Sequence, residues 1–229
     1  MHAKLISHSQ PTGRIHSGEL APTGLDNIQD LVAYCARVSN PSNQANTKTT
    51  TKLLEYLIKH KHWSPFEMAS ACIEIETTRD IARQLLRHRS FSFQEFSQRY
   101  ADIRDLDDNF VIREARLQDI TNRQNSVKTD DVVLMSQWVN KQKELIDHAK
   151  EVYNWAIDAG IAKEQARAVL PEGNTVSKLY VNGTIRSWIH YIELRSANGT
   201  QQEHMELARE VAAAIAQIYP KVADFVENN

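Results

Sequence analysis

The chain has 229 residues, of which 41% are hydrophobic and 24% charged, with a formal net charge of -2 at pH 7. This composition is typical of a soluble globular protein that buries its own core, and we expect one domain over residues 1–229. The near-neutral charge argues against nucleic acid as a partner, two distant cysteines argue against a disulfide framework or a zinc site, and no stretch reaches the roughly 20 apolar residues of a membrane span. We therefore expect a cytoplasmic protein with no membrane partner and no bound metal.

The first third of the chain predicts a strand, two helices and a second strand, in that order. The opening Lys-Leu-Ile-Ser suggests a short strand, and apolar residues at helical spacing predict helices over Leu25 to Arg37 and about Thr49 to His60. Residues 68–76 end in alternating apolar and polar side chains, which is typical of a half-buried strand. Two threonines follow and offer a cap for a third helix over Arg79 to about Arg87.

The remainder of the chain is dominated by predicted helices. Residues 100–130 are rich in Asp, Arg and Asn and predict a loop with short strands. A long amphipathic helix is expected over Asp131 to Ala159, closed by Gly160, and two more over Leu179 to Leu194 and Gln202 to Ile218. Because helices and strands do not alternate and no GxGxxG motif occurs, we expect an α+β fold with an antiparallel or mixed sheet flanked by long helices, not a Rossmann fold.

The stretch from Arg87 to Tyr100 holds the most promising chemistry. The helix before it places apolar residues on one face, so that Gln84 and Arg87 point away from the core. Three phenylalanines then interleave with polar residues, which predicts a loop anchored by its rings that presents its polar groups together. Arginines in such a loop suit phosphate groups, because the guanidinium donates paired hydrogen bonds. The alternative interpretation is a solvated helix end, where cations are favoured by the helix dipole.

This stretch matches the pattern RHRxxSxxExSxRY, and it resembles the signature of the flavin-dependent thymidylate synthase family. The matching residues are Arg87, His88, Arg89, Ser92, Glu95, Ser97, Arg99 and Tyr100. Four other elements resemble family motifs in the same order, so that the resemblance covers roughly residues 30–205. They are Ala-Arg-Val-Ser ending at Ser39, His62 to Glu67, Ala166 to Pro171, and the helix from Arg186 to Arg195. The chain departs from the common family pattern at Met68, Gln94 and Gly199.

The resemblance implies an enzymatic activity with several ligands. Members of the family methylate dUMP to dTMP, with 5,10-methylenetetrahydrofolate as the carbon donor, and tightly bound FAD is reduced by NADPH. They are homotetramers whose active sites are shared between subunits. The resemblance therefore implies a methyltransferase of nucleotide biosynthesis that binds small molecules and assembles with copies of itself.

The same resemblance implies roles for individual residues. Arg195 and His88 would be catalytic, with Arg195 facing the uracil ring. Residues expected to bind dUMP are Gln84, Arg87, Glu95, Ser97, Arg99, Arg167 and Arg195. Residues expected to bind FAD are Ser39, Ser64, Arg87, His88, Arg89, Glu95, Arg186 and His190.

Two other functions are considered beside this one. A non-catalytic nucleotide or single-stranded RNA binder would use the same arginines and phenylalanines as a stacking and phosphate platform, although the near-neutral charge argues against it. A metal-dependent nucleotide hydrolase would need metal-ligand spacing that the histidines do not offer. Cys35 and Cys72 are expected in the core and not as nucleophiles, because free cysteines are usually buried.

Overall fold

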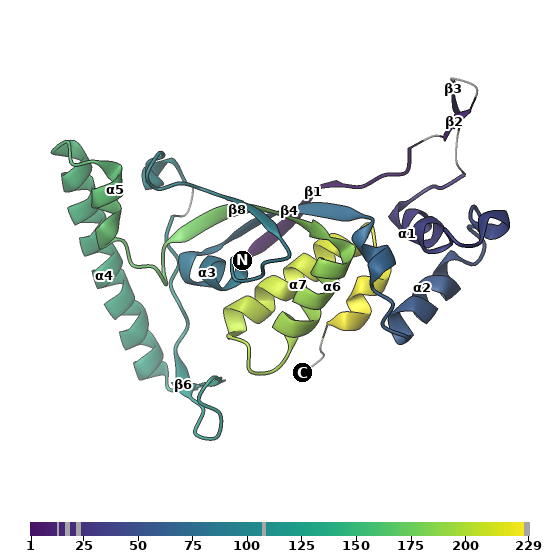
Figure 1. The fold of residues 1–229 in the computed structure, drawn as a ribbon. Coiled ribbons are helices and arrows are strands. Elements are labelled where there is room, and N and C mark those ends of the chain that lie inside the picture. Colours follow the sequence, from purple (N-terminus) through teal and green to yellow (C-terminus); the bar gives the residue numbers. More distant parts are fainter. Residues whose placement is uncertain (13, 17–18, 22–23, 107–108, 227–229) are drawn as a thin grey trace.

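A four-stranded antiparallel sheet lies at the centre of the computed structural model, which describes residues 1–12, 14–16, 19–21, 24–106 and 109–226 (Figure 1). The strands follow the order β1-β4-β8-β5. Their bounds are β1 His2–His8, β4 Ser70–Thr78, β8 Val176–Thr184 and β5 Ser92–Glu95. Every neighbouring pair is antiparallel, so the predicted α+β fold with an antiparallel sheet is confirmed.

Side chains of β4 and β8 alternate between a packed face and a polar face of the sheet. Ile73 on β4 is the register partner of Val181 on β8, and both are fully buried. Their neighbours Glu74 and Tyr180 are also partners and meet on the opposite face, where the Tyr180 hydroxyl donates to a Glu74 carboxylate oxygen at 2.7 Å. The expected half-buried strand over residues 68–76 is therefore confirmed, with the strand running to Thr78.

Two helices cover the packed face of the sheet, α6 (Ile185–Ser196) and α7 (Gln202–Ala216) (Figure 1). Trp188 of α6 is completely buried, and its indole N–H donates to the carbonyl oxygen of Ala71 at 3.0 Å. Val211 of α7 is equally buried. Burial of such large side chains against the sheet supplies most of the favourable free energy of folding.

The segment over residues 179–184 was expected to be helical, and that prediction was wrong. Residues Val176–Thr184 form strand β8, and the helix begins only at Ile185. The local alternation of buried Leu179 and Val181 with exposed neighbours has the period of a strand. Pairing with both β4 and β5 satisfies the backbone of this segment, and Thr184 caps the helix by accepting a hydrogen bond from the Ser187 N–H.

The three helices predicted in the first third of the chain are present at the expected positions. Helix α1 (Ile28–Ala36) begins at the cap Asn27, whose side chain accepts two backbone hydrogen bonds, and helix α2 follows over Thr50–Lys59. A hydrogen bond of 2.7 Å from the Thr50 hydroxyl to Asp30 ties the two helices together. Helix α3 (Arg79–Leu85) lies directly after β4 as predicted, but the expected threonine cap was wrong, because the Thr78 side chain accepts no backbone hydrogen bond and its hydroxyl donates to Asp80 at 2.5 Å. Between these helices are the short 3-10 turns η1 (Pro41–Asn43) and η2 (Ser64–Glu67).

Residues 100–106 and 109–130 form loops, a short 3-10 turn and short strands, as expected, and the long helix α4 (Val132–Asp158) follows them. Asp131 caps α4 by accepting from the Leu134 N–H at 2.9 Å, and Gly160 after its end adopts a positive φ of 80°. Helix α4 lies at one end of the sheet and α1 and α2 at the other (Figure 1). The remaining elements are β2 Arg14–His16, β3 Glu19–Ala21, η3 Ile103–Asp105, β6 Arg116–Gln118, β7 Ser126–Lys128, α5 Lys163–Ala166, η4 Arg167–Val169 and η5 Pro220–Phe225.

The buried hydrophobic residues that the structure describes form two clusters. The larger surrounds the sheet, α6 and α7, and the smaller joins α4 to the loop residue Ile103 through Tyr153 and Ala156. That these clusters belong to a single domain over residues 1–229 stays a prediction. Among the described helices, none is both long enough and apolar enough to cross a bilayer.

Candidate functional site

Aromatic side chains hold the segment between α3 and β5 in place. Phe91 is buried with its ring centroid 4.4 Å from that of Trp188, and Phe93 and Phe96 are half-buried. Of the polar residues in this segment, Ser92, Gln94 and Ser97 are exposed, whereas Glu95 is half-buried and Gln98 is buried. The rings anchor this segment as predicted, but the prediction of a loop with its polar groups together was wrong in part, because Ser92–Glu95 pairs with β8 as strand β5 and the polar side chains differ in burial.

The two residues expected to be catalytic lie in contact, although they are 107 positions apart in the chain. The Nε atom of Arg195 donates to Nε2 of His88 at 2.9 Å. A guanidinium is only a donor, so this imidazole nitrogen carries no proton and His88 is neutral, protonated on Nδ1. Burial lowers the pKa of His88 to about 4, and the cations of Arg195 and Arg87 act in the same direction.

The low pKa of His88 predicts how stability depends on pH. Unfolded His88 takes up a proton below its ordinary pKa of 6.5, whereas folded His88 stays neutral down to about pH 4. Because the unfolded state binds more protons in this interval, acidification from about pH 7 to about pH 5 lowers the free energy of unfolding. We expect His88→Gln to lose less stability than the natural protein over the same change, measured by urea unfolding at both pH values. An equal loss in the two proteins would contradict this account.

Gln84 of α3 is half-buried against the first turn of α7. Its Nε2 atom donates to the side-chain oxygen of Gln201 at 2.8 Å, and its Oε1 atom lies 3.1 Å from Nδ1 of His204. Both partners come from outside the recognised motifs, more than a hundred positions downstream, and no signal in the sequence pointed to them. The expectation that Gln84 points outward is therefore wrong in part, because α7 covers it.

Glu95 and the residues that follow β5 contact other elements than Gln84, His88 and Arg195 do. The Glu95 carboxylate accepts from the Ser177 hydroxyl at 2.8 Å and from Arg79 at 3.4 Å, so it is held at the end of the sheet. Beyond it, Ser97 and Arg99 are exposed and border a cavity of about 440 Å³ together with residues of the α5 turn. Arg99 forms an exposed ion pair of 3.5 Å with Glu164.

The residues expected to bind FAD are distributed over several elements. Arg186 at the start of α6 forms an ion pair with Glu67 of η2, and His190 packs edge-on against Trp63 with ring centroids 4.9 Å apart. Ser64 is exposed on η2 beside this pair of elements, and Ser39 is exposed in the turn after α1. These side chains are accessible to a ligand.

One chain therefore brings only some of the candidate residues together. The first group is His88 and Arg195, to which Gln84 is linked only through its partner His204, whose pKa both of them lower. The second group is Ser97 and Arg99, and the third is Ser64, Arg186 and His190. No hydrogen bond or ion pair between described residues joins one group to another. The guanidinium groups of Arg87, Arg89 and Arg167 make no such contact with any described residue, which leaves three cations available to a ligand.

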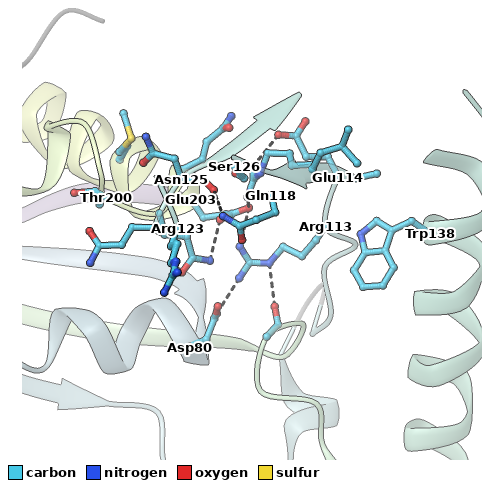
Figure 2. Close-up of a pocket in the computed structure, with 18 of the residues that line it drawn as sticks. Asp80, Arg113, Glu114, Gln118, Arg123, Asn125, Ser126, Trp138, Thr200 and Glu203 are labelled. Atoms are coloured by element: carbon cyan, nitrogen blue, oxygen red, sulfur yellow. Dashed lines mark hydrogen bonds and ion pairs between the residues drawn. The ribbon is translucent and has the colours of Figure 1, made fainter. Parts of the chain in front are cut away.

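A cavity of about 1090 Å³ that was not predicted lies between the β6–β7 hairpin, α4 and α7. Arg113, one of its lining residues, forms ion pairs with both Asp80 and Glu203, and Trp138 of α4 lies beside Arg113 (Figure 2). Glu203 is buried and is held by Arg113 at 3.1 Å and by Arg116. The segment over residues 100–130, to which no role was given from the sequence, thus packs against the start of α7.

Comparison with known proteins identifies relatives over almost the whole chain. The model of the family described as "Thymidylate synthase complementing protein" matches residues 23–221. A protein of Paramecium bursaria Chlorella virus 1 named "Probable flavin-dependent thymidylate synthase" is 47% identical over 223 residues, covering 97% of each chain. A Synechocystis protein named "Flavin-dependent thymidylate synthase" is 44% identical over 228 residues, covering 99% of this chain and 100% of its own.

The chain belongs to the flavin-dependent thymidylate synthase family. The fold agrees with this assignment. The crystal structure of a UMP/dUMP methylase, PolB from Streptomyces cacaoi bound with 5-Br dUMP, superimposes with a TM-score of 0.77 at 27% identity and covers 97% of this chain and 93% of its own. The sequence-based assignment to a family of methyltransferase-type enzymes is thereby confirmed.

The two cysteines of this flavin-dependent thymidylate synthase family member are half-buried, not fully buried as expected. Cys35 lies on α1, and Cys72 lies on the polar face of β4, because its neighbours Ala71 and Ile73 occupy the packed face. Burial raises the pKa of both thiols above the ordinary value. A raised pKa reduces the thiolate fraction, and the thiolate is the nucleophilic form.

Proposed function

We propose that this chain methylates dUMP to thymidylate, with 5,10-methylenetetrahydrofolate as the carbon donor and NADPH as the reductant of tightly bound FAD. The observation that carries the proposal is the 2.9 Å hydrogen bond between Arg195 and His88. This bond joins two family motifs that lie far apart in the chain. It uses only Nε of Arg195, and the two terminal guanidinium nitrogens, which have no hydrogen-bond partner among the described residues, can bind a ligand. The flavin, when bound, supplies the hydride-transfer chemistry.

The proposed dUMP site combines anion binding with stabilisation of charge on the ring. Ser97, Arg99 and Arg167 would hold the phosphate dianion, for which the bidentate geometry of arginine is suited. The exposed ion pair of Arg99 with Glu164 costs little to break. Arg195, oriented by neutral His88, would stabilise the negative charge that develops on the uracil ring. Gln84, Arg87 and Glu95 would complete the contacts with the nucleotide.

The residues proposed for FAD fit the chemistry of that cofactor. Its pyrophosphate needs cations, and Arg87 and Arg89 present guanidinium groups with no partner among the described residues. Its ring system and ribose need hydrogen-bonding groups, which the exposed hydroxyls of Ser39 and Ser64 offer. The remaining proposed FAD contacts are His88, Glu95, Arg186 and His190.

We propose further that the protein is a homotetramer with active sites shared between subunits. In support, no hydrogen bond or ion pair between described residues links Arg195 to Arg99, so the contacts within one chain do not by themselves assemble the residues proposed for dUMP. Exposed tryptophans on α4 also support it, since Trp138 is 43% and Trp155 64% exposed. Such large apolar side chains are commonly covered by a partner.

The proposed function is tested by supplying the FAD-loaded protein with dUMP, 5,10-methylenetetrahydrofolate and NADPH and measuring thymidylate. Formation of thymidylate that requires all three compounds is the expected result. A protein that neither retains flavin nor forms thymidylate, yet binds single-stranded RNA with a salt-dependent affinity, would overturn the proposal in favour of the nucleic-acid-binding alternative.

The cysteines provide a second test of the flavin-centred mechanism. We expect Cys35→Ser and Cys72→Ser each to retain thymidylate formation within about twofold of the natural protein, because neither thiol is activated. Activity is measured per bound FAD, and circular dichroism verifies that each variant is folded. Abolition of turnover in either folded variant would mean that a thiolate takes part in the reaction.

A further inference from the structure

We propose that His204 is a positioning residue, which fixes the side-chain amide of Gln84 in one orientation toward the nucleotide. This inference rests on the proposed function, in which Gln84 contacts dUMP. His204 is completely buried at the start of α7, and its Nδ1 atom lies 3.1 Å from Oε1 of Gln84. The family motifs in this sequence do not include this histidine.

The direction of each hydrogen bond follows from Glu203, because a carboxylate can only accept. Glu203 is buried between Arg113 and Arg116, and although burial raises its pKa, the Glu203 backbone N–H, these arginines and Gln201 lower it overall, so it is ionised. Its Oε2 atom lies 3.0 Å from the side chain of Gln201, which must therefore present its amide NH₂ group to it. The amide oxygen of Gln201 consequently faces Gln84.

The same reasoning extends to His204. Since the Gln201 oxygen accepts at 2.8 Å, Gln84 must present its NH₂ group to Gln201 and its carbonyl oxygen to His204. His204 must then carry its proton on Nδ1 and donate it. The other nitrogen, Nε2, is buried without a hydrogen-bond partner among the described residues, where a proton would be unpaired. Burial lowers the pKa of His204 to about 3, with Arg195 and His88 acting in the same direction, which agrees with a neutral ring.

The consequence is that Gln84 cannot exchange its oxygen and nitrogen by rotation. A flipped amide would place two donors against each other at the buried His204 and two acceptors at the half-buried Gln201, leaving these groups unsatisfied. Gln84 keeps one N–H donor and one oxygen lone pair free for a ligand. A binding group whose polarity is fixed before the nucleotide arrives does not lose that freedom on binding.

A double-mutant cycle tests this inference on the FAD-loaded protein, with the dissociation constant of dUMP as the readout. His204→Leu removes the donor and keeps the bulk, and we expect it to weaken dUMP binding about fivefold to tenfold. In a Gln84→Ala background the same substitution is expected to change binding less than about twofold, because His204 acts through Gln84. His204→Asn places an amide N–H near the position of Nδ1 and is expected to restore most of the affinity, with FAD content unchanged.

Equal weakening by His204→Leu in both backgrounds would overturn the inference, as would a failure of His204→Asn to exceed His204→Leu in affinity. If the natural protein does not bind dUMP, the proposed function fails and this inference with it. The tautomer of His204 can be measured without any ligand or variant, by solid-state NMR of the ¹³C,¹⁵N-labelled natural protein, with the His204 signals assigned through correlations to its sequence neighbours Glu203 and Met205. A neutral ring protonated on Nδ1 is expected, and protonation on Nε2 would overturn the inference even if the variants failed to fold.

Discussion

Replacement of Arg195 by alanine is expected to lower kcat for thymidylate formation by about 100-fold to 1000-fold. The guanidinium is the only cation hydrogen-bonded to His88 in the described structure, at 2.9 Å, and in the proposed site it stabilises charge that develops on the uracil ring. Its removal affects the transition state more than the bound cofactor. We therefore expect the FAD content, measured by visible absorbance of the purified protein, to stay within about twofold of the natural value.

Arg209→Ala is the matched control for Arg195→Ala. Arg209 is an exposed arginine on α7 that has no proposed contact with substrate or cofactor. Its replacement is expected to leave kcat and FAD content unchanged. If Arg195→Ala lost flavin and turnover in equal proportion, Arg195 would be a cofactor-binding residue, and its proposed role toward the uracil ring would be wrong.

Replacement of Gly183 on β8 by alanine is expected to displace Phe91 and so disturb the loop between α3 and β5. A Cβ atom at this position of β8 would overlap the ring of Phe91, and Phe91 cannot retreat easily because it is buried against Trp188. Inserting a methyl group into a packed core typically costs about 1–3 kcal/mol. We expect the free energy of unfolding to fall by about that amount, and dUMP binding to weaken because Phe91 anchors the loop that carries Arg87 and His88.

Gly173→Ala is the control for this substitution. A Cβ atom at Gly173 has no neighbour within 4 Å and no positive φ opposes it, so we expect a change below about 0.5 kcal/mol. Both variants are measured by urea unfolding and by titration with dUMP. Equal behaviour of the two variants would mean that the Phe91 ring has room to move, and the anchoring role assigned to it would be wrong.

The elements predicted from the sequence differ in how far local pattern decided them. Helix α4 was predicted within a residue or two because Asp131 caps it and Gly160 follows it, and these are local signals. The region over residues 179–184 was misread as helix because its apolar residues fit either period over so short a span. Its pairing with β4, which precedes it by about a hundred positions, decided the matter, and that pairing is not a local property.

The candidate site divides in the same way. The sequence by itself determined the family and the residue types of the site, because a pattern such as RHRxxSxxExSxRY is read along the chain and needs no geometry. Only the tertiary structure decided which residues meet. It brought His88 to Arg195 and covered Gln84 with Gln201 and His204, since contacts between distant segments depend on how helices pack on the sheet. Protonation states follow from those contacts, because burial and neighbouring charges set the pKa of a side chain. Both depend on the tertiary structure and cannot be inferred from the sequence alone.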